Sequence, residues 1–259
     1  MITAAFLVAL TASGPVDLDE AQRLFYNGRY AEADALTLRS CTSDLDSLAG
    51  CELRSSTLLF QIKRVIGPQR DKGAALKQCS QCAEWIGAFK GVTLSAQRVA
   101  RARLEVQPQD HETRFFLGKI DLNYVWLQLG VLGHKTGWAE YWEARRSLDA
   151  VLKQDPDHIR ARVARAWIDY IVDTEMPRGT RWVLGGGNKK RGLQTVREVA
   201  ELDADPFVRA EAGFALWDME QREENMAAAA DTARALTREF PGNEELQKFL
   251  AAHESRAAH

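Results

Sequence analysis

Apolar residues recur along this chain at the three- and four-residue spacing of helices that bury one face. One such stripe runs from Met226 through Ala229, Ala233 and Leu236 to Phe240. Runs of alternating β-branched residues, which would predict strands, are nearly absent. The pattern predicts an all-α protein with helices over the following residues: 18–27, 30–41, 46–66, 71–89, 93–105, 110–130, 137–154, 157–175, 188–202, 206–219, 222–239 and 243–254.

The middle of the chain reads as two copies of one unit. Residues 109–156 align with residues 157–204 at a shift of 48. The matched positions keep their chemical character: Arg114 with Arg162, Gly118 with Ala166, Ile120-Asp121 with Ile168-Asp169, Gly137 with Gly185, Leu148 with Val196, Val151 with Val199, and Asp155 with Asp203. Repetition at a fixed period predicts a stack of similar helix pairs, each of which buries the apolar face of its neighbour.

The segment GWAEYWEARRSLDAVLKQDPDH, which begins at Gly137, resembles the second helix of a tetratricopeptide repeat (TPR). In that repeat an aromatic, a small and several large apolar residues share one face, and Asp-Pro closes the helix. The corresponding residues here are Tyr141, Ala144, Leu148, Val151, Leu152, Asp155 and Pro156. Gly28, Tyr30 and Ala33 repeat the glycine, aromatic, alanine part of the pattern. The resemblance implies a right-handed superhelical solenoid of antiparallel, TPR-like helix pairs, which we expect to form a single domain over 16–254.

In a TPR-like solenoid the first helix of each pair lines a concave groove that binds segments of partner proteins. On one such helix a polar stripe runs beside the apolar stripe, and its members are His158, Arg162, Arg165 and Asp169. This stripe is either a plain solvated face or a contact for an acidic ligand.

The stretch RWVLGGGNKKRGLQ, residues 181–194, places three glycines before a Lys-Lys-Arg cluster. A phosphate-binding P-loop needs Ser or Thr directly after its lysine and a strand before its glycines, and the sequence offers neither. At the 48-residue shift, Gly187 falls on the turn between paired helices, Gly192 on a close-contact position and Asn188 on a helix N-cap. The stretch is therefore predicted to be a turn with a solvated basic rim, and the alternative is a site for an anion or an acidic partner. The rim residues are Arg178, Arg181, Lys189, Lys190 and Arg191.

Seven tryptophans are many for a chain of 259 residues. Trp126, Trp138 and Trp142 gather around the first long copy, and Trp167 and Trp182 belong to the second. Aromatic residues at helical spacing usually belong to the core, but exposed ones anchor partners. We therefore expect most of them to belong to the core, and Trp138 and Trp182, which stand near predicted turns, are the best candidates for exposure in the groove.

All four cysteines, Cys41, Cys51, Cys79 and Cys82, lie in the first third of the chain. An even, clustered set favours structural disulfides, for which three pairings are possible. Free thiols and a metal or redox site are the alternatives. Cys79 and Cys82 form a C-x-x-C, but no predicted strand precedes it, and Ala83 stands where haem attachment requires histidine.

Residues 1–15 contain an apolar run over 2–12 that has about the length of a signal h-region and is followed by small residues. The run is too short to span a bilayer, which requires about 20 residues. We expect residues 1–15 to be a signal peptide and the protein to be exported, with the periplasm as its location. The alternative is a short apolar helix that packs on the first repeat of a cytoplasmic protein. No other segment is apolar enough for a membrane span.

The net charge of −2 provides no field that would attract nucleic acid. The five histidines lack zinc-site spacings, and no G-x-S-x-G elbow is present. Paired glutamates such as Glu223-Glu224 open predicted helices, where negative charge meets the positive end of the helix dipole. The sequence therefore predicts no catalytic residue, no metal and no cofactor.

These observations predict a non-enzymatic, TPR-like scaffold that binds a protein or peptide partner. The candidate contact residues are Trp126, Trp138, Trp142, Arg162, Arg165, Arg181, Trp182, Lys189 and Lys190. The alternative is a periplasmic small-ligand-binding subunit similar to the TPR-type T component of tripartite transport systems. In that case Trp126, Trp138 and Trp182 would enclose an apolar pocket.

Overall fold

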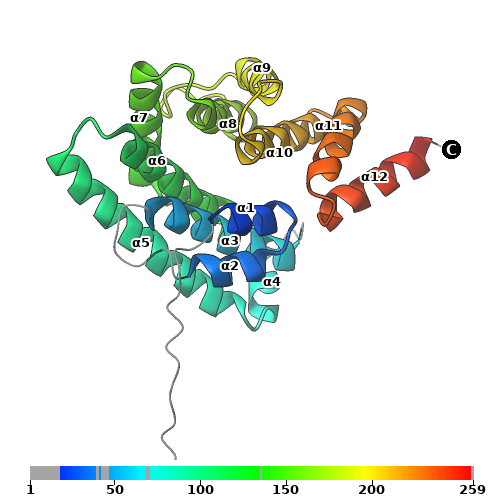
Figure 1. Cartoon of the computed structure of the whole chain (residues 1–259), viewed down its shortest axis with the longest axis horizontal. Coiled ribbons are helices and arrows are strands. Elements are labelled where there is room, and N and C mark those ends of the chain that lie inside the picture. The colour runs from blue at the N-terminus through cyan, green and yellow to red at the C-terminus, as the bar shows by residue number, and fades with distance from the viewer. Residues whose placement is uncertain (1–17, 39–40, 42–46, 68–70, 135, 258–259) are drawn as a thin grey trace, which may run out of the picture.

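The computed structural model describes residues 18–38, 41, 47–67, 71–134 and 136–257, and every regular element among them is helical (Figure 1). The elements are α1 (Leu18–Tyr26), α2 (Tyr30–Thr37), α3 (Ser47–Ile66), α4 (Lys72–Gln78), α5 (Cys82–Val106), α6 (His111–Val125), the π-helical η1 (Trp126–Val131), α7 (Trp138–Gln154), α8 (Ile159–Glu175), α9 (Lys189–Ala200), α10 (Pro206–Arg222), α11 (Met226–Glu239) and α12 (Glu244–Ala257). The prediction of an all-α protein is confirmed. The predicted signal at 1–15 lies outside the described residues. In the described part, no helix is both long and apolar enough to cross a membrane.

Capping side chains explain where several helices begin. The side chains of Asp71, Asp110, His158, Asn188 and Asp205 each accept a hydrogen bond from a backbone N–H in the first turn of the helix that follows. Such caps satisfy donors that have no partner within the helix. The predicted N-cap role of Asn188 is confirmed.

Three stretches depart from the predicted helix boundaries. The predicted helix start at 222 is wrong: α10 runs to Arg222 and α11 begins at Met226, so Glu223 and Glu224 lie in the turn between the two helices and open neither. The predicted helices 71–89 and 93–105 are instead the short α4 and the 25-residue α5, because the backbone is extended at Cys79 and α5 continues without a break through Gly91. The predicted helix 110–130 is α6 followed by η1, where the helix widens and the N–H of Leu132 donates to the carbonyl of Leu127, five residues back.

Helices that are close in sequence pack against one another, and the row curves until α1 meets α10 (Figure 1). Tyr26 at the end of α1 lies at this junction: its ring stacks on Phe214 with centroids 5.5 Å apart and lies 5.2 Å from the ring of Phe240. The side-chain amide of Asn243 donates to the carbonyl of Tyr26 at 2.7 Å. The first and last helices are therefore held together by packing and by hydrogen bonds.

The buried apolar residues form one large cluster over α3 to α8 and two smaller ones, one joining α8, α9 and α10 and the other joining α10, α11 and α12. Residues matched by the 48-residue shift share their burial: Ile120 and Ile168, Asp121 and Asp169, Leu148 and Val196, Val151 and Val199. Gly137 and Gly185 both have positive φ, at 92° and 77°. A Cβ on Gly192 would lie 2.7 Å from the carbonyl oxygen of Ala166, as expected for a close-contact position. The matched pairs named here thus share their burial or their backbone conformation.

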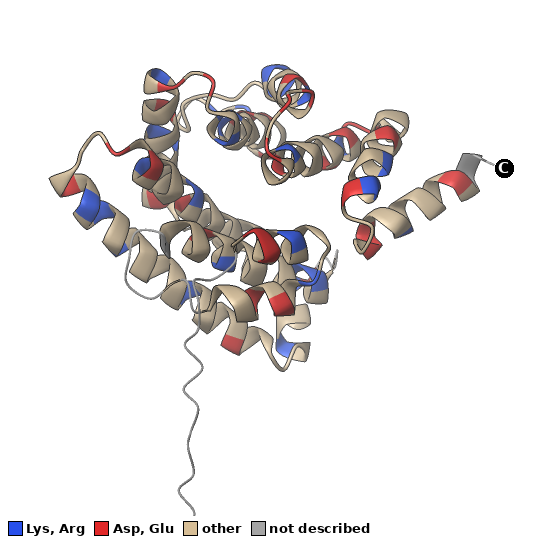
Figure 2. Cartoon of the chain, viewed as in Figure 1, with Lys and Arg blue, Asp and Glu red and all other residues tan. Residues whose placement is uncertain are grey.

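The predicted polar stripe on α8 is engaged within the chain. His158 caps the helix, and Arg162 lies 3.5 Å from Glu198 of α9. Arg165 pairs with the buried Asp169 at 2.6 Å and with Asp149 of α7 at 2.7 Å. The stripe therefore bridges α8 to its two neighbours. Acidic and basic residues are both scattered over the helices, without a large region of one sign (Figure 2).

Candidate functional site

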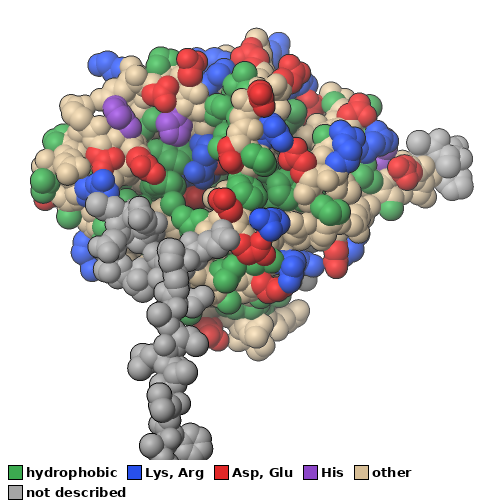
Figure 3. Space-filling model, in the orientation of Figure 1, with side chains coloured by type: hydrophobic (Ala, Val, Ile, Leu, Met, Phe, Trp, Pro, Cys, Tyr) green, Lys and Arg blue, Asp and Glu red, His purple; other side chains and the backbone are tan. Residues whose placement is uncertain are grey.

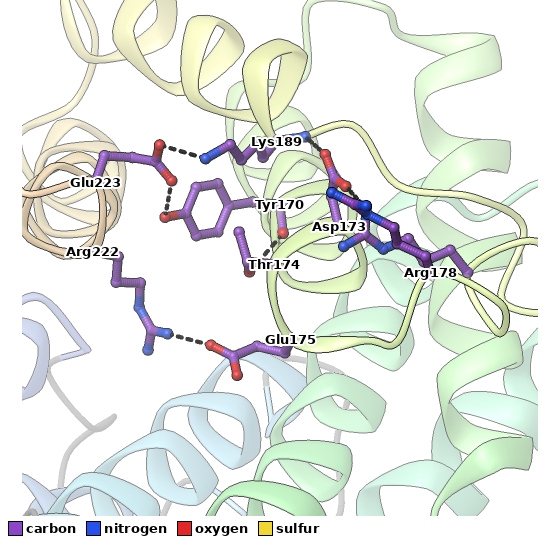
Figure 4. Close-up of a pocket in the computed structure, with 9 residues that line it drawn as sticks. Tyr170, Asp173, Thr174, Glu175, Arg178, Lys189, Arg222 and Glu223 are labelled. Atoms are coloured by element: carbon purple, nitrogen blue, oxygen red, sulfur yellow. Dashed lines mark hydrogen bonds and ion pairs between the residues drawn. The ribbon is translucent and has the colours of Figure 1, made fainter.

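A cavity of about 560 Å³ opens where the end of α8, the start of α9 and the end of α10 meet the loop 176–188, which we call the glycine loop (Figure 4). Four basic and three acidic side chains line it, together with a phenol and a hydroxyl: Arg178, Arg181, Lys189, Arg222, Asp173, Glu175, Glu223, Tyr170 and Thr174. This size lies within the usual range of small-ligand sites, about 300–1,000 Å³, but the lining is far more polar than such sites commonly are.

One wall of the cavity converges on Glu223. The Tyr170 hydroxyl donates to this carboxylate at 2.9 Å, and the Lys189 ammonium donates to its other oxygen at 2.7 Å (Figure 4). The hydrogen bond from Lys189 is the main cause that lowers the pKa of Glu223. Burial, with the bond to Glu223, raises the pKa of Tyr170. Glu223 is therefore ionised at neutral pH, and Tyr170 remains a hydrogen-bond donor.

The opposite wall is organised by Asp173 of α8. Its carboxylate pairs with the guanidinium of Arg181 in the glycine loop and accepts the backbone N–H of Lys189 at 2.9 Å. The Arg181 guanidinium also donates to the carbonyl of Met176 at 3.0 Å. Below them, Arg222 of α10 reaches Glu175 of α8 at 3.0 Å. These bonds hold both ends of the loop against the helices.

Arg178 lines the cavity but forms no ion pair with any residue that the structure describes. The exposed Lys190, which follows the lining residue Lys189 in sequence, is likewise unpaired among the described residues. The other three basic residues of the lining each have a carboxylate partner. The site therefore presents one guanidinium that is free to meet an acidic group from outside.

The tip of the glycine loop is fastened to α7. The Arg145 guanidinium donates to the carbonyls of Leu184, Gly185 and Gly186 at 3.0, 2.8 and 3.3 Å. The Tyr141 hydroxyl donates to the Leu184 carbonyl at 2.7 Å. Gly185 and Gly186 both have positive φ, at 77° and 74°, so the chain turns sharply here in a conformation that favours glycine. The predicted turn at the glycine triplet is confirmed.

The same loop exposes large apolar side chains. Trp182 is 77% exposed and Val183 is 51% exposed, while Leu184 beside them is buried. Trp138, at the start of α7, is 42% exposed. The two tryptophans named as the best candidates for exposure, Trp138 and Trp182, are thus both exposed. On the face seen in Figure 3, hydrophobic side chains lie among interspersed charges.

The remaining tryptophans of the candidate set serve packing. Trp126 lies edge-on to Trp167 with centroids 6.2 Å apart, and Trp142 lies 5.4 Å from the ring of Tyr141 and packs on the large cluster. Neither cavity that we describe, this one or a smaller one of about 210 Å³ between the turn at Gly28 and the end of α3, is lined by Trp126, Trp138 or Trp182.

Two buried polar clusters lie elsewhere and tie helices together. Burial opposes the charge of Glu211, but Lys119 and Arg160 hold its pKa down to about 2. Asp121 is fully buried and accepts from Gln97 at 2.6 Å; burial, helped by the charge of Glu143, raises its pKa to about 9. In the described part of the chain, no group of three His, Cys, Asp or Glu side chains is placed to hold a metal ion.

Sequence reasoning missed Asp173, Glu223, Tyr170 and Arg145, which shape the site. Tyr170 and Glu223 are 53 positions apart, so their hydrogen bond depends on how α8 and α10 pack. A signal was available for Arg145, because it stands one helical turn after Tyr141 in the aromatic first part of α7. Both side chains donate to the Leu184 carbonyl in the glycine loop. Comparison with protein-family models, with curated proteins and with solved structures gave no match.

Proposed function

We propose that this chain is a non-enzymatic scaffold that binds a protein partner through the glycine loop. Trp182 and Val183 expose apolar surface on a loop whose backbone is fixed by hydrogen bonds from Arg145, Tyr141 and Asn188. This combination of rigidity and exposure is the observation on which the proposal depends.

The energetic reasoning starts from the cost of ordering. A flexible loop loses conformational entropy when it binds, whereas a loop already fixed in place loses little. Tryptophan is the residue most enriched among interface hot spots, where it fills a pocket of the partner. Trp182 is an exposed tryptophan on a loop that is already fixed in place, because Arg181 is bound to α8 and Leu184 to α7.

Charge further defines the partner. Arg178 and Lys190, which have no ion-pair partner among the described residues, flank the exposed tip of the glycine loop in sequence, and both are exposed. A partner segment with an acidic residue beside an apolar pocket would complement them. Such complementarity accelerates association and selects the partner.

The architecture suits this role. In the proposal, the helix pairs form a right-handed superhelical solenoid of TPR-like repeats that closes on itself where Tyr26 meets Phe214. The shared burial of residues 48 positions apart supports repetition. Two disulfides, Cys41–Cys51 and Cys79–Cys82, support a location in an oxidising compartment outside the cytoplasm.

A small-ligand role is the second candidate, and the 560 Å³ cavity is the observation in its favour. Because charged groups line that cavity, its ligand would be polar and acidic, and Arg178 would hold it. The cavity differs from the apolar tryptophan-lined pocket expected for a subunit similar to the T component. Calorimetric titration with small dicarboxylates separates the two candidates: saturable heat that the Arg178→Ala variant abolishes would favour the ligand role.

Photo-crosslinking tests the scaffold proposal. A benzophenone amino acid replaces Trp182 in the full chain, and a matched control carries it at Val106, which is 79% exposed on α5. After irradiation in the source cells, we expect one adduct of discrete mass from position 182 and none of that mass from position 106. Equal adduct patterns from both positions, or none from position 182, would contradict the proposal.

A further inference from the structure

The two disulfides of the chain differ in their setting. Cys41–Cys51 connects residues 10 positions apart, whereas Cys79–Cys82 connects residues only 3 apart, across the junction of α4 and α5. In the chain-entropy model a disulfide stabilises the fold less as the loop that it closes becomes shorter. The Cys79–Cys82 bond is therefore the one whose loss costs the fold less.

The two cysteines of this short disulfide are unequally exposed. Cys79 follows α4 in extended backbone, is partly exposed, and precedes the exposed Ser80 and Gln81. Cys82 is the first residue of α5, is 1% exposed, and belongs to the large apolar cluster. An external thiol can therefore approach Cys79 but is shielded from Cys82.

We propose that Cys79–Cys82 is a thiol–disulfide exchange site that reacts with an external dithiol. A thiolate of that dithiol attacks Cys79 Sγ, the Cys79–Cys82 bond breaks, and Cys82 leaves as a thiolate that takes up a proton. The second thiol of the reagent then attacks its own sulfur in the mixed disulfide and releases Cys79. The dithiol is oxidised to a disulfide by two electrons, and the two cysteines become thiols. This site shares no residue with the glycine loop.

The surroundings allow the bond to open while the helices persist. Cys82 leaves at the N-terminus of a 25-residue helix, where backbone N–H groups favour a thiolate. Phe89 and Val92 anchor α5 in the core, and the Asp71 side chain caps α4. Lys72 also donates to the carbonyl of Gly130 in η1, which holds α4 in place. None of these contacts requires the disulfide.

Timed reduction tests the proposal on the full chain. The oxidised protein is treated with dithiothreitol, thiols are alkylated at intervals, and mass spectrometry maps them while far-UV circular dichroism follows helicity. We expect Cys79–Cys82 to open at least ten-fold faster than Cys41–Cys51, with helicity unchanged. If Cys79–Cys82 opens only as fast as the chain unfolds, or more slowly than Cys41–Cys51, the proposal is overturned.

Paired variants test which sulfur is attacked. In Cys82→Ser, Cys79 remains and should form a mixed disulfide with glutathione disulfide. In the matched Cys79→Ser variant, the buried Cys82 should react at least ten-fold more slowly. Equal rates would overturn the assignment of Cys79. Should either variant not fold, the reduction rates of the wild-type chain decide.

Discussion

Replacing Gly187 by alanine tests how the glycine loop is seated on α8. A Cβ at this position would lie 2.6 Å from the backbone nitrogen of Asp173 and 2.7 Å from the backbone oxygen of Asp169. Ordinary contact begins at 3.4 Å, and backbone atoms cannot rotate away as the end of a side chain can. The loop or the helix must therefore move by several tenths of an ångström.

The cost of this movement has two parts. Overpacking a well-packed site costs about 1–3 kcal/mol. The same shift disturbs the hydrogen bond from the Asn188 N–H to the Asp169 carbonyl, which is 3.1 Å long, and a bond of this kind contributes about 0.5–1.5 kcal/mol. We expect Gly187→Ala to lower the free energy of unfolding by about 1.5–4.5 kcal/mol, the sum of these two ranges.

Urea denaturation followed by circular dichroism measures this loss against two controls. Gly91 in α5 has nothing within 4 Å of its added Cβ, so Gly91→Ala should stabilise the protein by up to about 1 kcal/mol through helix propensity. Gly186 also has open space but a φ of 74°, so Gly186→Ala should cost about 1 kcal/mol through backbone strain alone. A Gly187→Ala variant no less stable than Gly186→Ala would refute the steric reasoning.

Three further predictions concern the buried Asp121, the contacts of Arg145 with the glycine loop, and the packing of Tyr26. The pKa of Asp121 rises from 3.8 to about 9 on folding, so the folded state holds a proton that the unfolded chain releases, and stability falls as pH rises from about 4 to 9. Asp121→Asn should flatten this fall. Denaturation between pH 6 and 9 in which the free energy of unfolding of both proteins changes equally with pH would contradict the prediction. Arg145→Ala removes three carbonyl contacts, so hydrogen exchange should accelerate at 184–187 and not in the middle of α7; unchanged exchange at 184–187 would count against the anchoring role. Tyr26→Ala removes the ring that packs on Phe214 and Phe240 and should cost about 3 kcal/mol in urea denaturation; a loss below about 1 kcal/mol would show that α1 does not hold the end helices together.

Local sequence signals accounted for most helix boundaries. Asp110 and Asn188 cap helices as short polar side chains do, and the 3.6-residue apolar pattern predicted the interior of the helices. The break at Cys79 was missed because helix-forming residues stand on both sides and the chain direction there depends on packing, which no local pattern encodes. The junction at Tyr26 was missed for a similar reason, since its partner Phe214 is distant in sequence.

The site was predictable only in part. Trp182 was a candidate for exposure because it stands beside a predicted turn, and the glycine triplet predicted that turn. The pairing of Lys189 with Glu223 links positions 34 apart, and no local pattern encodes it. The loop thus followed from local chemistry, and the cavity beside it from the packing of α8, α9 and α10.

The affinity of the partner captured at position 182 tests the central claim most directly. The full chain, Trp182→Ala and the matched exposed variant Val106→Ala are compared by surface plasmon resonance with the purified partner. A hot-spot residue contributes about 2 kcal/mol or more, so we predict that Trp182→Ala raises Kd by roughly thirty-fold or more and that Val106→Ala leaves it unchanged. Equal Kd values for Trp182→Ala and the unaltered chain would contradict the role of the glycine loop in binding.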